Sequence, residues 1–443
     1  MTRVLLAAHA SVGHTNALRS IGRSLLAGGD AVAMVMPVVR LPLPGLAPQA
    51  ARVAAGIPAA VRGDGIELFE LGTSWAALWH GLWLSSSTGY DELGHAMGLF
   101  TAGLAGHARE LASFARSWRA DVVVADYLFF AAFLGARLSR TPYAAFFHSA
   151  MPFDAPGNPP FGSGLPNDAP RDDAWREAER RLKELSDVAD ARLAAGARQL
   201  GLDAPRAGIL ARPYSEDLNL LATLPELEPG LAPLDATTVF TGPCLGGRAA
   251  ENPDDPALRA LKPEGRRAYV SLGTVFNSNP RAFVEILRGL DVEGLQVVVS
   301  GGASTARLSK NPPSRNSHVF ERVPQLAVLE RVDVVVTHGG NNTVQETLAA
   351  GKPMLVVPFG GDQLENARRV ERLGAGIALL PAKLSSEAVR AAVTRLLSEP
   401  GFRERATTVA NAIRPVDGTA RAVAAIRQLA ARFASSGVEG GGR

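Results

Sequence analysis

Short apolar runs that alternate with helix-type segments are the feature that most limits how this chain can fold. Each run is apolar along nearly its whole length, without the alternation that is typical of a strand with one face in water. Such strands are typical of parallel sheets whose two faces are both covered by helices. The runs form two series: Val4–Ala8, Ala31–Met36, Asp121–Ala125 and Tyr143–Phe147, then Ala268–Leu272, Val297–Ser300, Val332–Val336 and Met354–Val357.

Two tandem β-α-β series predict an α/β protein made of two doubly wound, Rossmann-like domains. A stretch rich in proline and glycine separates the series and is typical of a linker. We therefore expect four parts: an N-terminal domain (1–225), a linker (226–263), a C-terminal domain (264–425), and a helix end with a flexible tail (426–443).

The segments between the strands carry helix and loop signals. Helix patterns cover His14–Ala27, Phe129–Leu138 and the charged stretch 172–200, and a last helical region covers Phe402–Phe433. Proline and glycine in 37–65 indicate a loop, and those in 150–170 indicate a surface loop over a cleft.

Composition excludes several classes of protein. The chain has 443 residues, of which 47% are hydrophobic, so both domains can form a core, and a net charge of +3 does not favour nucleic-acid binding. The longest apolar stretch, Val122–Leu138, contains Asp126 and Arg137 and does not predict a membrane span. A single cysteine, Cys244, and the absence of a signal-peptide pattern favour a cytoplasmic location.

The hexapeptide from His338 to Thr343 lies between a strand pattern and a helix pattern and predicts a phosphate-binding turn. Gly339 and Gly340 let the backbone approach an anion, and the first N–H groups of the helix point toward it. His338, Asn342 and Thr343 add side-chain donors. An ordinary strand-to-helix turn with an asparagine cap is the alternative that these six residues alone leave open.

The stretch Arg322–Gln363 resembles the donor-binding signature of the GT-B-fold, nucleotide-sugar-dependent glycosyltransferases, the UDP-glycosyltransferase and macrolide glycosyltransferase family. The resemblance rests on Pro-Gln at 324–325, on the motif His-Gly-Gly-x-Asn-Thr, on a glutamate three residues after the threonine, and on Asp-Gln at 362–363 followed by Asn-Ala at 366–367. It implies two Rossmann-like domains that face a central cleft.

The same resemblance implies a role for each matching residue. Gln325 is expected to contact the base, Glu346 the ribose hydroxyls, and Asp362 with Gln363 the sugar. His338, Asn342 and Thr343 are expected to bind the diphosphate. Ser271-Leu272-Gly273-Thr274 matches a family loop that approaches the diphosphate or the sugar. The donor-binding set is completed by Gly13, Arg322, Val323, Gly340 and Asn341.

Two residues of the first half match the family's catalytic pair. His14 follows a Gly at the opening of the first predicted helix and matches the family's general base. Asp126 ends a strand on the same expected edge of the sheet and matches the aspartate that holds this histidine, fixing its tautomer and stabilising the imidazolium. His9 is a weaker candidate. A helix cap is the alternative role for each member of the pair, and a surface position is a further alternative for His14.

Residues of an acceptor pocket are less sharply indicated. Trp75, Trp79 and Trp83 recur every four residues, a pattern typical of a core as well as of an aromatic wall. His148 ends a strand on the edge of His14 and either lines the acceptor pocket or has a structural role.

The sequence lacks the motifs of competing chemistries. No Asp-x-Asp sequence is present to hold a metal-bound sugar diphosphate, and neither a Walker lysine loop, a GxGxxG turn after a strand nor a zinc motif occurs. We therefore expect no cofactor and no metal, with the helix dipole and neutral donors stabilising the leaving group.

These observations favour an inverting transfer of a hexose, glucose for preference, from UDP- or TDP-sugar to a small hydrophobic hydroxylated natural product such as a polyketide, macrolide or phenol. Arg322 stands where many family members have a base-stacking Trp, so weak discrimination between uracil and thymine is expected. A nucleotide-sugar epimerase or hydrolase, and a non-catalytic binding partner, remain alternatives. The sequence leaves open the acceptor and whether the protein is a monomer or a homodimer.

Overall fold

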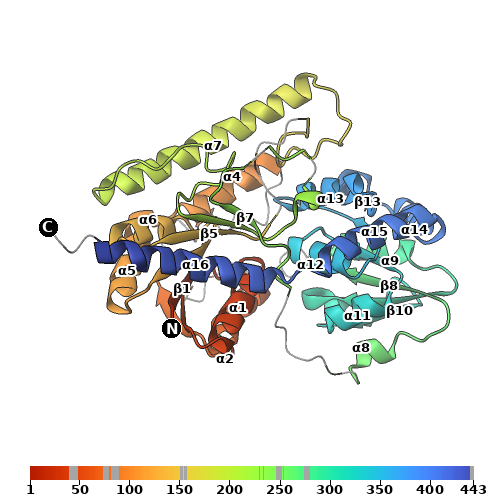
Figure 1. The fold of residues 1–443 in the computed structure, drawn as a ribbon. Helices are drawn as coiled ribbons and strands as arrows, with labels where there is room; N and C mark the ends of the chain where they lie inside the picture. The colour runs from red at the N-terminus through yellow and green to blue at the C-terminus, as the bar shows by residue number, and fades with distance from the viewer. Residues whose placement is uncertain are drawn as a thin grey trace. The chain divides into compact units, whose positions relative to one another are not determined.

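The computed structural model describes residues 1–38, 48–72, 79–80, 89–149, 153, 157–228, 230–232, 234–245, 252, 254–273 and 280–439. By their contacts these residues form two compact units. Unit 1 comprises Met1–Phe161, Pro170–Arg248 and Val416–Arg443, and unit 2 comprises Gly162–Ala169 and Ala249–Pro415. Each unit is built around one parallel sheet (Figure 1).

The described part of unit 1 contains a seven-stranded parallel sheet with the order β3-β2-β1-β4-β5-β6-β7. Its strands are β1 (Arg3–Ala7), β2 (Ala31–Pro37), β3 (Glu67–Leu71), β4 (Val122–Asp126), β5 (Tyr143–Phe147), β6 (Leu218–Leu221) and β7 (Thr238–Phe240). Its helices are α1 (Val12–Ala27), α2 (Pro48–Gly63), α4 (Gly89–Phe100), α5 (Leu104–Ser117), α6 (Phe130–Ser139), α7 (Asp173–Gln199) and α16 (Gly418–Glu439).

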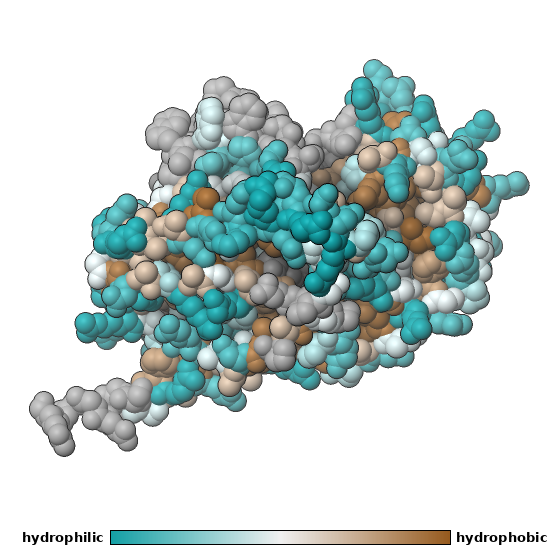
Figure 2. Space-filling view, turned by 90° about the horizontal axis from the view of Figure 1, so that it is seen from above, coloured by the Kyte–Doolittle hydropathy of each residue, from teal (hydrophilic) through white to brown (hydrophobic). Residues whose placement is uncertain are grey.

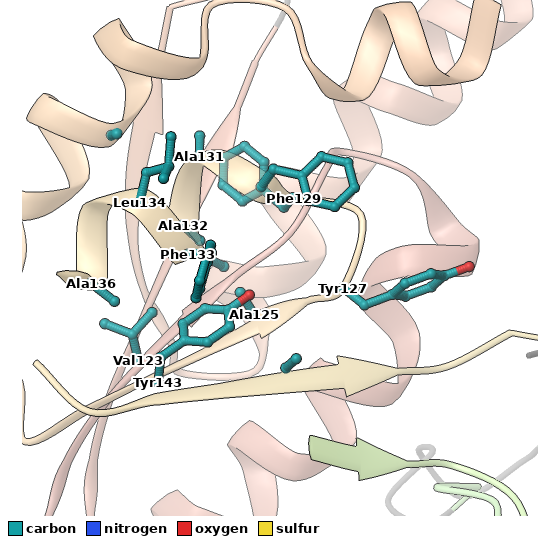
Figure 3. Close-up of a cluster of buried hydrophobic side chains, with 14 of the residues drawn as sticks. Val123, Ala125, Tyr127, Phe129, Ala131, Ala132, Phe133, Leu134, Ala136 and Tyr143 are labelled. Atoms are coloured by element: carbon teal, nitrogen blue, oxygen red, sulfur yellow. The ribbon is translucent and has the colours of Figure 1, made fainter. Parts of the chain in front are cut away.

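Successive residues of these strands point to two separate apolar cores. Leu5, Val123 and Ala145 belong to the core formed with α5, α6 and α7. On that face Phe133 of α6 packs against Tyr143 of β5, with ring centres 5.3 Å apart (Figure 3). Leu6 belongs to the core formed with α1 and α16. Helices therefore cover both faces, as the continuous apolar runs predict.

Unit 2 repeats this plan with a six-stranded parallel sheet, in the order β10-β9-β8-β11-β12-β13 among its described residues. The strands are β8 (Arg266–Ser271), β9 (Leu295–Ser300), β10 (Ser317–Phe320), β11 (Val334–Thr337), β12 (Met354–Val356) and β13 (Gly376–Ala378). The helices are α8 (Pro256–Arg259), α9 (Pro280–Gly289), α10 (Thr305–Lys310), α11 (Gln325–Arg331), α12 (Asn341–Ala349), α13 (Gln363–Arg372), α14 (Ser386–Ser398) and α15 (Pro400–Ile413).

The last helical region differs from the sequence expectation, because it is two helices that belong to different units. Pro415 lies between α15 and α16, where it cannot supply a helical N–H, and the Asp417 carboxylate accepts a hydrogen bond from Ala420 N–H at the start of α16. Ile426 and Leu429 of α16 are buried in the core of unit 1. The expected break at 425 therefore falls inside a helix that completes the first unit.

Two further segments contain more regular structure than their composition indicates. Within 37–65, where we expect a loop, α2 forms, and Ile57 and Val61 one turn apart are buried in the core with α1. Alanine-rich sequence favours this helix despite Pro58. Within the expected linker, Thr238–Phe240 forms β7 at the edge of the first sheet, and the change of unit follows at 248–249.

Hydrophilic side chains cover much of the face seen in Figure 2, with hydrophobic ones showing between them. Among the described residues, none of the helices combines the length and the apolar character that crossing a bilayer requires.

The packing of α16 gives a test of its place in unit 1. Ile426 is 0% exposed, so Ile426→Ala leaves a cavity and should lower the free energy of unfolding by about 2 to 5 kcal/mol. Phe433→Ala, on the same helix at 40% exposure, is the control and should change it by less than about 1 kcal/mol. Urea unfolding followed by fluorescence measures both. Equal effects of the two changes would contradict the packing.

Candidate functional site

Three ionisable side chains meet at the carboxyl ends of neighbouring strands in unit 1. β1, β4 and β5 are adjacent, and Ala7 pairs with Ala125 in the register of the sheet. His14 lies in the first turn of α1 after β1, Asp126 is the last residue of β4, and His148 directly follows β5. Strand order therefore brings His14 next to two residues that lie more than a hundred positions further along the chain.

The buried carboxylate of Asp126 is the centre of this group. Its Oδ2 lies 3.0 Å from His14 Nδ1 in a hydrogen bond and 2.7 Å from His148 Nδ1 in a closer, bent contact. Its Oδ1 accepts a hydrogen bond from Leu128 N–H at 2.9 Å. Burial alone raises the pKa of Asp126, but the charges of the two imidazoles and their polar contacts with the carboxylate outweigh it and hold this pKa well below its usual range.

An ionised carboxylate fixes the protons of its partners. Because it only accepts hydrogen bonds, His14 must carry a proton on Nδ1, which leaves Nε2 of the neutral ring with a lone pair. The side chain of His14 is 16% exposed, whereas that of Asp126 is fully buried. The pair thus has the arrangement of a general base and the acid that orients it.

His9 is placed beside this pair but in a different state. Its ring packs against Phe100 and Phe129, and its centre lies 6.0 Å from that of His14. Burial, followed by the nearby His14, lowers the pKa of His9 to about 3. His9 is therefore a neutral ring at physiological pH, with Nε2 3.3 Å from the carbonyl oxygen of Leu128.

His14, Asp126 and His148 also have the spacing of metal ligands, with donor atoms within 4.8 Å of one another. A carboxylate between two imidazoles produces the same spacing through polar contacts alone, so the distances do not by themselves indicate an ion.

In unit 2 the glycine-containing turn after β11 leads directly into α12. Gly339 has φ of +90°, a conformation that favours glycine, and its N–H donates to Thr337 Oγ1 at 3.2 Å. The first intrahelical hydrogen bond runs from Val344 N–H to Gly340 O, so the N–H groups of 341–343 lie ahead of the helical ladder. These groups and the helix dipole form a site suited to an anion.

The ring of His338 lies against the backbone of two glycines. A Cβ atom at Gly273 or at Gly340 would come within 2.5 Å of this ring, so both close approaches require glycine. Burial lowers the pKa of His338 to about 4, so the ring is neutral at pH 7. It can donate a hydrogen bond but adds no positive charge.

Gln325 and Glu346 are bonded to each other. The Gln325 amide donates to Glu346 Oε2 and, at 3.3 Å, to Thr343 Oγ1, while its carbonyl oxygen accepts from Tyr269 OH at 2.8 Å. The Gln325 side chain therefore fixes the orientation of Glu346. Its expected contact with a nucleobase stays a prediction. Tyr269 carries no motif and was not found by sequence reasoning.

Side chains of α13 hold the turn in place. Asn366 Nδ2 donates to Gly339 O at 2.9 Å, and Arg369 Nη1 donates to Asn341 Oδ1 at 3.3 Å. Gln363 accepts from Phe359 N–H at 2.9 Å, so its carbonyl oxygen has an internal role, whereas Asp362 is half-buried at the helix start. Sequence analysis missed Arg369, although its place one helical turn after Asn366 is a signal that could have found it.

The other predicted donor residues are placed as follows. Ser271 ends β8 and is buried, and its carbonyl accepts from His338 N–H at 3.3 Å. Arg322 is exposed before α11, Val323 and Asn342 are half-buried, and Gly13 lies in the first turn of α1 in unit 1. Thr274 lies outside the described residues.

Of the tryptophans expected at an acceptor pocket, Trp79 is 60% exposed, while Trp75 and Trp83 lie outside the described residues. His148 is buried against Asp126, and its ring centre lies 4.7 Å from that of His14.

Known proteins share both the sequence pattern and the fold. The model of the family described as UDP-glucoronosyl and UDP-glucosyl transferase matches residues 261–429. The chain is 31% identical to 4'-demethylrebeccamycin synthase of Lentzea aerocolonigenes over 338 residues, which cover 75% of this chain and 79% of that protein. It is 30% identical to oleandomycin glycosyltransferase of Streptomyces antibioticus over 184 residues, which cover 41% and 42% of the two chains.

Among solved structures, the calicheamicin glycosyltransferase CalG4 resembles this chain with a TM-score of 0.73. The match covers 98% of this chain and 99% of that one at 21% identity. At this identity the match shows a shared fold.

The close fit of His338 gives a test of the unit 2 site. Gly340 has φ of −60°, so Gly340→Ala introduces no backbone strain, but the new methyl group must displace the ring. Affinity for UDP and TDP, measured by calorimetry, should fall on the order of 10-fold, the equivalent of a moderate overpacking cost. Gly401→Ala, whose Cβ meets no atom within 4 Å, is the control. Unchanged affinity in Gly340→Ala would show that this turn does not contribute to nucleotide binding.

Proposed function

The chain belongs to the family of UDP-glucoronosyl and UDP-glucosyl transferases and is a glycosyltransferase of GT-B fold, and from this premise we propose an inverting hexosyl transfer with His14 as the general base. The donor is UDP- or TDP-glucose, and the acceptor is a hydroxyl group of a small hydrophobic natural product. The observation that carries the proposal is the 3.0 Å hydrogen bond between His14 Nδ1 and the buried, ionised Asp126.

In this mechanism His14 Nε2 removes the proton of the acceptor hydroxyl as its oxygen attacks the anomeric carbon of the sugar. The C–O bond to the nucleoside diphosphate breaks in the same displacement, so the configuration at that carbon inverts. Asp126 keeps the ring in the correct tautomer and stabilises the imidazolium that forms. Attack and departure on opposite sides of one carbon require only one base and no covalent intermediate.

Unit 2 supplies the groups that bind the donor. The N–H groups at the start of α12, with the neutral His338 and the Thr343 hydroxyl, stabilise the negative charge on the departing diphosphate. Glu346, held by Gln325, accepts hydrogen bonds from the ribose hydroxyls, and Asp362 and Gln363 contact the sugar. This set of donors makes a divalent ion unnecessary, so we propose transfer without metal or cofactor.

The names of relatives support the class of acceptor. The rebeccamycin and oleandomycin enzymes are named for natural products, and we propose an acceptor of that kind for this chain. The chain's single cysteine, Cys244, is buried, and burial raises the pKa of its thiol to about 12, which suits a protein working in a reducing cytoplasm.

Substitutions of His14 and Asp126 test the proposed base. Because a positioned general base contributes about 10²- to 10⁴-fold, His14→Ala should lower kcat by that factor while UDP and TDP affinity changes little. Asp126→Asn should lower kcat strongly as well, because the amide no longer selects the reactive tautomer. Single-turnover product formation, read by mass, measures both. Near-normal transfer to an alcohol or phenol acceptor by His14→Ala would refute the assignment.

The second prediction concerns the donor. With Arg322 in place of a stacking tryptophan, UDP-glucose and TDP-glucose should have kcat/KM values within about 10-fold of each other. A TDP-deoxysugar should be poorer, because it lacks a hydroxyl group that Asp362 or Gln363 is proposed to bind, at a cost of roughly 1 to 3 kcal/mol. Steady-state assays in EDTA compare the three donors.

Each part of the donor prediction has its own contrary result. A preference for the deoxysugar would exclude glucose as the donor, and strict rejection of one base would exclude the role given to Arg322. Loss of all transfer in EDTA that Mg²⁺ restores would exclude the metal-free mechanism. Sugar release without an acceptor would indicate a hydrolase instead.

A further inference from the structure

We propose that His148 is a positioning residue for the transfer reaction, which shares the Asp126 carboxylate with His14 and thereby limits how strongly that carboxylate holds a proton on the base. The inference rests on the proposed role of His14 and extends it to a residue outside the catalytic pair. It starts from the observation that two imidazoles, one from α1 and one from the end of β5, contact the same oxygen atom.

The shared oxygen requires a proton on each ring. His148 Nδ1 lies 2.7 Å from Asp126 Oδ2, closer than His14 Nδ1 at 3.0 Å. Two lone pairs at 2.7 Å would repel each other, and the ionised carboxylate supplies only lone pairs. His148 therefore carries hydrogen on Nδ1 and polarises Oδ2 toward itself, even though the contact is bent.

A carboxylate oxygen that serves two donors stabilises each of them less than it would stabilise one. When His14 takes the proton of the acceptor, Asp126 stabilises the imidazolium that forms. This stabilisation is weaker than it would be for this pair of residues alone, because part of the carboxylate's negative charge interacts with His148. The ring centres lie 4.7 Å apart, so a positive charge on one ring also disfavours a second on the other. The two histidines are thus coupled through a single carboxylate.

The other titratable groups around the pair do not supply this effect. His9 faces His14, but its buried ring stays neutral, and His107 lies beyond it on α5. Tyr127 faces His148, with ring centres 5.9 Å apart, and burial raises the pKa of Tyr143 and of Tyr214 above the ordinary tyrosine value. The phenols of Tyr143 and Tyr214 are therefore neutral at the pH of the reaction, and Asp126 is the charged partner of both imidazoles.

The consequence is a base that is neutral and ready at a lower pH. Beside an unshared carboxylate, the imidazolium form of a histidine persists up to a higher pH. This form has no lone pair and cannot take the proton of the acceptor. Sharing Oδ2 shifts this balance toward the neutral ring. His148, which follows β5, also fixes the orientation of the Asp126 carboxylate, because Leu128 N–H already occupies Oδ1.

Two substitutions separate the polar contact with Asp126 from the shape of the His148 side chain. His148→Phe keeps a ring against Tyr127 and His14 but provides no donor to Oδ2. His148→Asn keeps an N–H group near the position of Nδ1 but does not titrate. His318→Asn, on an exposed position of β10 in unit 2, is the control for a loss of histidine elsewhere.

The main readout is the acid limb of kcat/KM against pH, with UDP-glucose and a phenolic acceptor. We expect the midpoint to rise by about 0.5 to 1 unit in His148→Phe, because the polar contact of His148 Nδ1 with the carboxylate is lost. In His148→Asn it should stay within about 0.3 unit of the wild type, because the amide N–H preserves a polar contact with the carboxylate. Equal shifts in the two variants, or no shift in His148→Phe, would overturn the proposal.

A second readout does not depend on turnover. The ring signal of His14 in the NMR spectrum, identified by its loss in His14→Ala, titrates with pH in the wild type and in both His148 variants. Its midpoint should follow the kinetic shift, rising in His148→Phe only.

The two readouts distinguish the failures. If the NMR midpoint moves as expected while His14→Ala retains activity, the carboxylate is shared but His14 is not the base. If the NMR midpoint is the same in all three proteins and only the acceptor KM rises, His148 contacts the acceptor instead, and the positioning role is refuted.

Discussion

A buried negative charge at the edge of an apolar sheet is the constraint around which the first site is organised. Asp126 is 0% exposed, and both faces of its sheet are packed with aliphatic and aromatic side chains. An ionised carboxylate in such a place is strongly disfavoured unless polar partners surround it. Leu128 N–H and two imidazoles supply that compensation. The same contacts that make the charge tolerable also orient the imidazoles, so stability and chemistry depend on one set of interactions.

Under the proposed function, unit 2 has a different task, since its turn presents N–H donors to an anion. Its turn relies on backbone N–H groups and on His338, a ring kept neutral by burial against Gly273 and Gly340. Asn366 and Arg369 reach back from α13 to the turn and fix it from behind. The two units therefore use histidine in contrasting ways, since His14 bonds to an ionised carboxylate whereas burial keeps His338 neutral.

Sequence predicts those features that depend on local pattern and strand order. The apolar runs predict both parallel sheets, and because parallel strands end at one edge, they also predict that His14 and Asp126 lie close together. Features that depend on long-range packing are not predicted. The α16 helix is separated from unit 1 by the whole of unit 2 in sequence, yet its Ile426 stripe fits the first core. Sequence analysis does not predict α2 and β7, because the proline and glycine in these segments favour a loop more strongly than their short apolar repeats favour a helix or a strand.

The side-chain partners inside the site were the hardest features to predict, for a physical reason. A motif identifies the residues that contact a ligand. The residues that position these motif residues follow from three-dimensional packing and carry no sequence pattern of their own. Gln325 belongs to a motif, yet its amide is committed to Glu346 and Tyr269. His148 belongs to none, yet it is the nearer of the two imidazoles to Asp126. Leu128 N–H occupies one carboxylate oxygen, and the two imidazoles share the other. In the role proposed for His14, this sharing sets the strength of the base, and it appears only once three strand ends have been placed side by side.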